Sequence, residues 1–212
     1  LNYSSHGGNG VMGKGWSIGG AGAIQRCSEI GATVTFGAGD KFCLNGQKLV
    51  AISGTYGAHG TTYKTELDSF VRVTSKGGSI GNPDEFVVEY TNGKVAYFGL
   101  DTASIAAHNN NEAYLWAVNK IVDTFGNLIS YEYEQETDSL EYRLLQVNYT
   151  DNENVYGSAK SYIEFVYADG AQQPQFGYAF GETTSLSKTL TNVRSYSDGY
   201  LLRDYHLNYD AG

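Results

Sequence analysis

The residues that could do chemistry gather in the glycine-rich segment at the start of the chain. Gly8–Gly13 fits the G-x-G-x-x-G pattern of dinucleotide-binding loops, and Gly8–Lys14 comes close to a phosphate-binding P-loop. Gly15–Gly19 fits the G-x-S-x-G pattern, in which Ser17 would be a hydrolase nucleophile. These patterns act where a strand leads into a helix, because that junction positions the phosphate or the serine hydroxyl.

The sequence around these patterns does not predict the helix that they need. Glycine recurs from Gly13 to Gly22, and glycine is among the poorest helix formers. Gly15 also stands where a P-loop requires the serine or threonine hydroxyl that binds Mg²⁺. We therefore predict no catalytic residue and no cofactor site, and we interpret the glycines as turns.

A second group of chemically suggestive residues is a row of carboxylates. Glu132 and Glu134 resemble the Glu-x-Glu pair of ADP-ribosyltransferases, and Glu136 extends the row. Side chains two residues apart on a strand share one face of the sheet, so we interpret the row as a solvated acidic face. Asp151 and Glu153 carry oxygen ligands suited to Ca²⁺, but the distal glutamate of a calcium-binding loop is absent, so no metal site is predicted.

The two cysteines, Cys27 and Cys43, allow either one disulfide or two buried thiols. No secretion signal is visible in the sequence, so we expect the thiols. The four histidines do not have the spacing of a zinc finger relative to the cysteines, and no zinc site is predicted.

The composition favours a β-rich fold. The chain has 212 residues, of which 27 are glycine, 18 are tyrosine and 2 are proline, and 17% are charged. Tyrosine favours pleated sheets and glycine favours tight turns, whereas a disordered chain would be poor in aromatic residues. The net charge of −9 without a basic cluster argues against a nucleic-acid partner. No run of about 18 apolar residues is present, so we predict no membrane insertion by this segment.

Alternation with a period of two predicts the strands that would position these residues. Such runs flank Asn45-Gly46 and Asn92-Gly93, and an Asn-Gly pair between alternating runs predicts a hairpin with a type I′ turn. The second half repeats a pattern of strand, polar turn and strand over residues 117–133, 144–167 and 190–209.

These patterns predict an all-β fold, mostly antiparallel and built by hairpins, as a meander or open sandwich in a single domain over residues 1–212. Residues 101–113 are expected to form a loop or a short helix. Tyrosines near the strand ends could stack on sugars or bases. We favour packing on one sheet face, with the hydroxyl reaching water or backbone.

Four blocks of sequence, in this order, resemble the N-terminal SpvB-like segment of bacterial Tc-toxin B subunits and related Rhs, or YD-repeat, proteins. The first block is the glycine-rich segment up to Cys27, and the others are residues 40–49, Thr62–Phe70 and Trp116–Tyr133. The positions that carry the family motifs, all expected to be structural, are Gly10, Gly13, Gly15, Trp16, Ser17, Arg26, Cys27, Phe42, Cys43, Gly46, Glu66, Asp68, Trp116, Asp123, Gly126, Asn127, Tyr131 and Tyr133.

The resemblance implies an organisation and a role. Residues 1–115 would hold the Gly-rich SpvB-like blocks, and residues 116–212 the YD-like strand-turn-strand units. Such segments contribute to a hollow β-sheet shell that encloses a toxic C-terminal polypeptide and docks on a translocation pore. The expected function is therefore a non-catalytic, structural segment of a secreted, extracellular protein, with the rest of the shell and other toxin-complex subunits as partners.

The chain is expected to be a fragment of a longer protein, and its exposed edge strands to pair with a neighbouring chain or another copy. Two other functions stay open. An adhesive or glycan-binding β-module would use exposed tyrosines. An enzyme, either a serine hydrolase or one like the ADP-ribosyltransferases, would use Ser17 or the pair Glu132 and Glu134, although SpvB-type relatives carry their ADP-ribosyltransferase further along the chain.

Overall fold

The computed structural model describes residues 1–6, 9–10, 12–28, 33–37, 39–101, 105–108, 112–136, 141–155, 160–170, 175–179 and 182–209. Throughout these residues the regular elements are strands, and neighbouring strands pair in antiparallel fashion. The predicted all-β, hairpin-built fold is confirmed.

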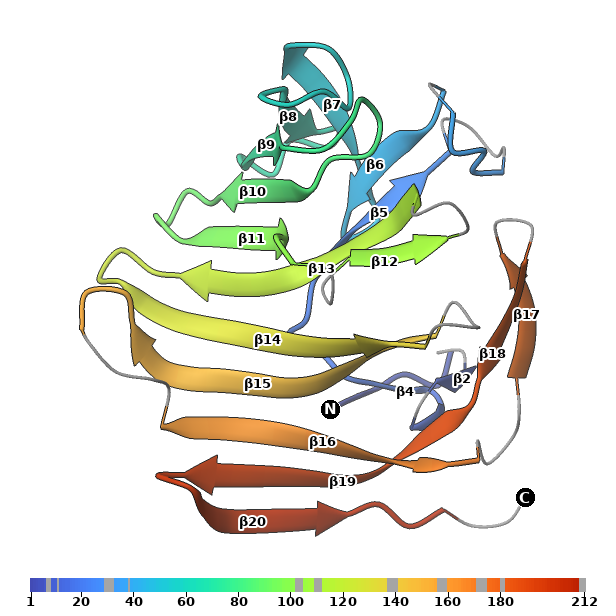
Figure 1. The fold of residues 1–212 in the computed structure, drawn as a ribbon, viewed down its shortest axis with the longest axis vertical. Coiled ribbons are helices and arrows are strands. Elements are labelled where there is room, and N and C mark those ends of the chain that lie inside the picture. Colours follow the sequence, from blue (N-terminus) through green and yellow to red (C-terminus); the bar gives the residue numbers. More distant parts are fainter. Residues whose placement is uncertain are drawn as a thin grey trace.

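Eight strands close into a barrel-like sheet in the upper part of Figure 1. Seven of them follow one another as a meander, and β13 pairs with both the first and the last of the seven, which closes the ring. The barrel strands are β5 (Ala23–Cys27), β6 (Lys41–Leu44), β7 (Gln47–Ser53), β8 (Thr62–Thr65), β9 (Arg72–Lys76), β10 (Glu85–Glu89), β11 (Val95–Gly99) and β13 (Glu112–Val122).

A second, open sheet starts from the same β13 and fills the lower part of Figure 1. Beyond β13 its strands, in spatial order, are β14 (Asn127–Gln135), β15 (Tyr142–Asn152), β16 (Ser161–Asp169), β19 (Lys188–Ser197) and β20 (Tyr200–His206). Within the described residues β20 pairs with β19 alone, so the open sheet ends in an edge strand.

Short elements complete the fold. The N-terminal segment forms two small ladders, and it places Met12 and Ile18 against the apolar core of the open sheet. Figure 1 shows the β17–β18 hairpin at the side of the molecule. The bounds are β1 (Asn2–Tyr3), paired with β4 (Trp16–Ser17); β2 (Asn9–Gly10), paired with β3 (Gly13–Lys14); and β17 (Gln175–Ala179), paired with β18 (Glu182–Leu186).

The two predicted Asn-Gly turns differ. Asn45 and Gly46 have φ of 48° and 83°, which is the left-handed pair that a type I′ turn requires. In the second turn only Gly93 has a positive φ, of 80°, and the Tyr90 N–H donates to the Lys94 carbonyl at 2.9 Å. The prediction of a type I′ turn is therefore wrong at Asn92-Gly93. The hairpin closes at the pair Tyr90 and Lys94 and has a three-residue loop, where a type I′ turn has two residues.

The prediction of a loop or short helix for residues 101–113 is also wrong over part of its length. Ile105–His108 form the strand β12, which pairs with the beginning of β13. A long buried strand such as β13 needs partners for its backbone N–H and C=O groups, and β12 supplies them between Glu112 and Trp116, before the pairing with β11 begins at Val118.

β13 contributes to two separate cores. Trp116 and Val118 lie in the core of the barrel, whereas Leu115 and Ala117 lie in the core between the open sheet and the N-terminal segment. Successive side chains of a strand point to opposite faces, so both faces of β13 are buried. This strand joins the two halves of the fold.

Replacing Trp116 with alanine should lower the free energy of unfolding by about 3–5 kcal/mol, the usual cost of removing a large buried aromatic side chain. The indole is fully buried, and its Nε1–H donates to the Pro83 carbonyl at 2.8 Å. Denaturant unfolding followed by circular dichroism measures the effect. Leu201→Ala is the control, because this side chain is 51% exposed. Equal losses for the two variants would contradict the assignment.

Candidate functional site

The G-x-S-x-G segment does not form a nucleophile elbow. Ser17 lies on the two-residue strand β4, opposite Asn2, and its side chain is exposed. Among the described residues, no three His, Cys, Asp or Glu side chains gather as a metal-binding group. The same part of the chain holds no helix with the length and apolarity needed to cross a bilayer.

The barrel interior is a cluster of aromatic rings centred on Phe42. The Phe42 ring meets Phe86 and Trp116 edge to face, with centroids 5.0 Å and 5.3 Å away, and it stacks on Tyr56 at 5.5 Å. Such contacts add to the stability that the buried area alone provides. The family-motif residues Phe42 and Trp116 therefore lie together as core residues.

Arg26 enters this core from β5 and is 6% exposed. Its Nε donates to the Ala113 carbonyl at 3.0 Å, its Nη2 donates to the Gly81 carbonyl at 2.6 Å, and its Nη1 lies 3.8 Å from Asp40 Oδ2. Burial lowers the pKa of Arg26, while the Asp40 carboxylate acts in the opposite direction. The guanidinium thus ties β5, β13 and two loops together.

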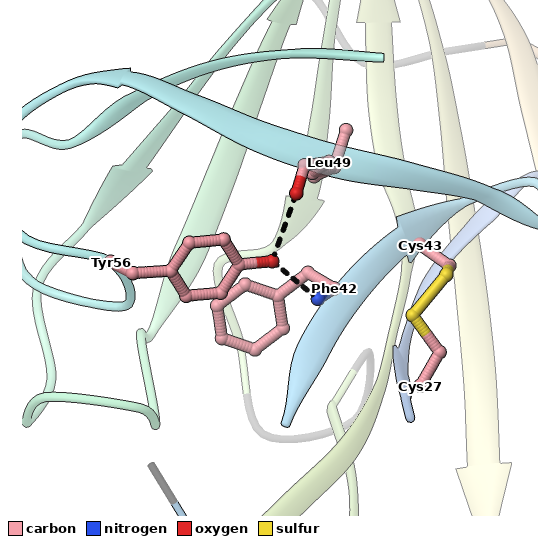
Figure 2. The surroundings of a disulfide bond; sticks show 5 residues. All are labelled: Cys27, Phe42, Cys43, Leu49 and Tyr56. Carbon is pink, nitrogen blue, oxygen red and sulfur yellow. Dashed lines mark hydrogen bonds between the residues drawn. A yellow bond between two sulfur atoms is a disulfide. The ribbon is translucent and has the colours of Figure 1, made fainter. Parts of the chain in front are cut away.

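The cysteines form a disulfide between β5 and β6, so the expectation of two buried thiols is wrong. Cys27 and Cys43 are diagonal neighbours on adjacent strands, with Cα atoms 6.0 Å and sulfur atoms 2.08 Å apart. Figure 2 shows the bridge on the side of β6 opposite the Phe42 ring. The pairing depends on the register of β5 against β6, which the spacing of the two cysteines does not reveal.

Tyr56 fills a gap between β6 and β7. The two strands pair at Cys43 and Leu44, and beyond that point the Tyr56 hydroxyl accepts from the Phe42 N–H at 2.7 Å and donates to the Leu49 carbonyl at 3.1 Å (Figure 2). One phenol hydroxyl thus replaces a direct ladder bond and keeps two buried backbone groups satisfied.

Several tyrosines of the open sheet, among them Tyr131 and Tyr133, pack in the core that the N-terminal segment covers. Their hydroxyls donate to backbone carbonyls: Tyr133 to Val118 at 2.8 Å, and Tyr131 to Gly20 at 3.2 Å. Burial raises the pKa of Tyr133, and it raises that of Tyr114 to about 12. The interpretation of tyrosines as packing residues is confirmed at these positions, whereas Tyr162 and Tyr196 stack on each other on the opposite face and Tyr205 is 57% exposed.

The opposite face of the open sheet carries a row of polar side chains at one register. From β14 to β20 the row consists of Glu132, Gln146, Glu164, Arg194 and Asp204, each directly across from the next. Arg194 is the cation of the row, with its Nε 3.1 Å from Asp204 and its Nη1 3.6 Å from Glu164. The charged face is thus built of cross-strand pairs.

The suggested catalytic carboxylates belong to this polar face. Glu134 Oε2 and Glu136 Oε1 each accept from Arg143 Nη2 at 2.5 Å. The Arg143 side chain is 2% exposed, and the hydrogen bond and charge of Arg143 lower the pKa of Glu136. Glu132 accepts from Asn148 Nδ2 at 2.8 Å. The Glu134 and Glu136 side chains are still 48% and 36% exposed, so the row lies on a solvated face as expected, and Arg143 is the buried partner that joins two of its carboxylates.

Comparison with models of known protein families shows to which family this chain belongs. The family model of SpvB, the Salmonella virulence plasmid 65kDa B protein, matches residues 1–198. The chain belongs to the SpvB family. A comparison with curated protein sequences finds no match.

Solved structures share the fold with this SpvB-family chain. The N-terminal domain of the effector protein SpvB from Salmonella typhimurium strain LT2 superposes with a TM-score of 0.76 at 21% identity, over 92% of this chain and 81% of that one. The TcdB2-TccC3-Cdc42 complex superposes with a TM-score of 0.80 at 18% identity, over 98% of this chain but 13% of that one. A Photorhabdus luminescens Tc holotoxin pore gives 0.76 at 18% identity, over 92% and 12%.

The N-terminal SpvB-family glycines serve close backbone approaches. Gly15 has a φ of 83°, and a Cβ added there would lie 2.6 Å from the Ser4 carbonyl oxygen. Gly10 and Gly13 face each other in the β2–β3 ladder. The Trp16 ring lies 5.2 Å from the Tyr3 ring across the β1–β4 pair. Gly13–Lys14 and Trp16–Ser17 are strands, whereas a phosphate-binding loop needs a helix at this place.

The Asp123–Asn127 motif caps the hairpin between β13 and β14. Asp123 Oδ1 accepts from the backbone N–H groups of Phe125 and Asn127 at 2.8 Å and 2.9 Å. Hydrogen bonds, first of all the one from the Asn127 side chain, lower the pKa of Asp123. Gly126 has a φ of 81°, which favours glycine. The motif is an Asx-type turn.

The suggested calcium ligands, Asp151 and Glu153, bind groups of the protein itself. Glu153 Oε1 lies 3.0 Å from Lys120 Nζ, and Asp151 Oδ1 accepts from the Asn152 N–H at 2.8 Å.

The motif residues Glu66 and Asp68 lie in the exposed loop between β8 and β9. No pattern in the sequence marked Tyr56 or Arg143. Tyr56 binds backbone groups of Phe42 and Leu49, and Arg143 binds Glu134 and Glu136, and both sets of contacts follow from strand pairing that the sequence does not reveal.

Replacing Tyr56 with phenylalanine should lower the free energy of unfolding by about 1–3 kcal/mol, because the Phe42 N–H and Leu49 carbonyl would lose their shared partner. Chemical denaturation measures the loss. Tyr200→Phe is the matched control, since Tyr200 is 75% exposed. An unchanged midpoint for Tyr56→Phe would show that the hydroxyl bridge does not stabilise the barrel.

Reduction of the Cys27–Cys43 bridge should lower the free energy of unfolding by about 3 kcal/mol, the chain-entropy value for a loop of this size; the cysteines are 16 residues apart. Thermal unfolding with and without dithiothreitol measures it. The Cys27→Ser, Cys43→Ser double variant should match the reduced protein and not respond to reductant. A reductant-sensitive double variant would rule out this explanation.

Proposed function

We propose that this chain is a non-catalytic wall segment of a secreted toxin-complex or Rhs-type shell that encloses or carries a toxic polypeptide. The observation that carries the proposal is the open sheet, which starts from the closed barrel at β13 and ends at β20, a strand that pairs on one side within the described residues. An edge strand presents a row of N–H and C=O groups to which a further strand can add. A growing wall needs such an edge.

The relatives support this role. The chain belongs to the SpvB family and spans 13% of the toxin chain with which it shares its fold, so here it would act as one section of a larger assembly. Its partners would be the remainder of that shell and other toxin subunits.

The local chemistry is consistent with a structural role. Arg26, Arg143 and Tyr56 bind backbone carbonyls or carboxylates of neighbouring strands rather than converging on an open pocket. The Cys27–Cys43 disulfide suits an oxidising, extracellular setting, because the cytosol keeps most protein thiols reduced.

A proline placed on the free edge of β20 should block addition of a strand while the chain still folds. The Leu207 N–H donates to the Thr191 carbonyl at 2.8 Å, and the two-residue repeat of the ladder then directs the Tyr205 N–H toward β19 and the His206 N–H toward the free edge. His206→Pro in the full-length protein should therefore expose the enclosed polypeptide to protease, with little change in the unfolding temperature.

Tyr205→Pro is the matched control, since it removes a bond to β19 and should lower the unfolding temperature. Full protease protection in a folded His206→Pro protein would contradict the wall proposal. An enzyme would instead be favoured by NAD hydrolysis that is lost in Glu134→Ala, or by labelling of the unaltered protein with a fluorophosphonate that is lost in Ser17→Ala.

A further inference from the structure

The loop between β8 and β9 exposes two large apolar side chains that belong to neither core. Leu67 is 74% exposed and Phe70 is 75% exposed. Isolated apolar side chains at a surface are common, but here two stand in one six-residue turn, Thr65–Phe70, next to carboxylates. We call this turn the Phe70 loop.

The Phe70 loop is held in one conformation by its own hydrogen bonds. Thr65 is 2% exposed, and its Oγ1 donates to the Leu67 carbonyl at 2.8 Å and accepts from the Ser69 N–H at 3.0 Å. Asp68 Oδ1 accepts from the Phe70 N–H at 2.9 Å. The two apolar side chains are therefore presented from an ordered frame, which reduces the entropy that a binding event would cost.

The backbone at Phe70 is in an unfavourable conformation. Its φ is 56°, a left-handed value that is rare for an aromatic residue. A strained residue normally persists where surrounding packing holds it, but this ring lies mostly in solvent. The isolated chain gains little stability from Phe70, so the strain and exposure indicate a role outside the chain.

The charges of the loop indicate what would contact it. Glu66 and Asp68 are exposed and alternate with the apolar residues along the loop. The nearby Arg72 is engaged by Glu89 at 3.5 Å. A protein surface that receives this loop would need an apolar pocket for the ring and basic groups at the rim for the carboxylates. Another copy of a chain with a net charge of −9 is a poor match.

We propose that the Phe70 loop is a docking knob that inserts Leu67 and Phe70 into an apolar pocket with a lysine- or arginine-rich rim on a separate partner protein. The loop belongs to the barrel and lies away from the pairing edge of β20. The inference therefore stands apart from the proposed wall function, and either can fail without the other.

Photo-cross-linking in the full-length protein tests the proposal. The photoreactive amino acid p-benzoylphenylalanine replaces Phe70, and in a matched control it replaces Phe125, which is 79% exposed at another turn. Mass spectrometry should locate the Phe70 adducts on one segment, rich in apolar residues and flanked by lysine or arginine, that the control does not label. Adducts confined to the same polypeptide would contradict docking on a partner protein.

A pair of substitutions separates docking from folding. Phe70→Gly relieves the left-handed strain at this position, so the unfolding temperature should stay unchanged or rise. The docking test places the cross-linker at Ser69 instead. With it there, the Leu67→Ser, Phe70→Gly double variant should give at least tenfold fewer adducts than the protein that keeps Leu67 and Phe70. Adducts spread without a common segment, adducts to a second copy or to lipid, or a drop in unfolding temperature for Phe70→Gly would each overturn the proposal.

Discussion

The fold depends on one strand that is buried on both faces. β13 sends Trp116 into the barrel and Leu115 and Ala117 into the core of the open sheet. A register shift of one residue would exchange these two sets of side chains and disrupt both cores at once. The pairings of β13 with β5 and β11, which close the barrel, and with β14, which starts the open sheet, all require that register.

The polar groups of the chain mainly connect strands. Arg26 binds carbonyls from the β12–β13 region and from the loop at Gly81, and Tyr56 spans β6 and β7. Arg143 binds carboxylates that a short motif had made suggestive of catalysis. Because these groups are buried or bound by their neighbours, they stabilise a particular arrangement of strands. The proposed wall segment and the proposed docking loop both depend on this rigid frame.

Several features could be predicted from short stretches of sequence. Asn45-Gly46 supplies two left-handed residues and forms its hairpin, and the Asp123–Asn127 motif forms its own hydrogen-bonded turn. Several tyrosines of the open sheet pack in its core, as the alternation indicates. Local patterns failed at Asn92-Gly93 and at β12, where the pairing of neighbouring strands determined the backbone.

The sequence by itself determined the all-β class, the hairpin order of most strands and several of their turns, because those features depend on residues close together in the chain. Only the tertiary structure decided that eight strands close into a barrel, that Cys27 and Cys43 are bridged, and that Tyr56 rather than a direct ladder bond joins Phe42 to Leu49. Each depends on the register between strands or on the contact between remote segments, and no local periodicity encodes such a register.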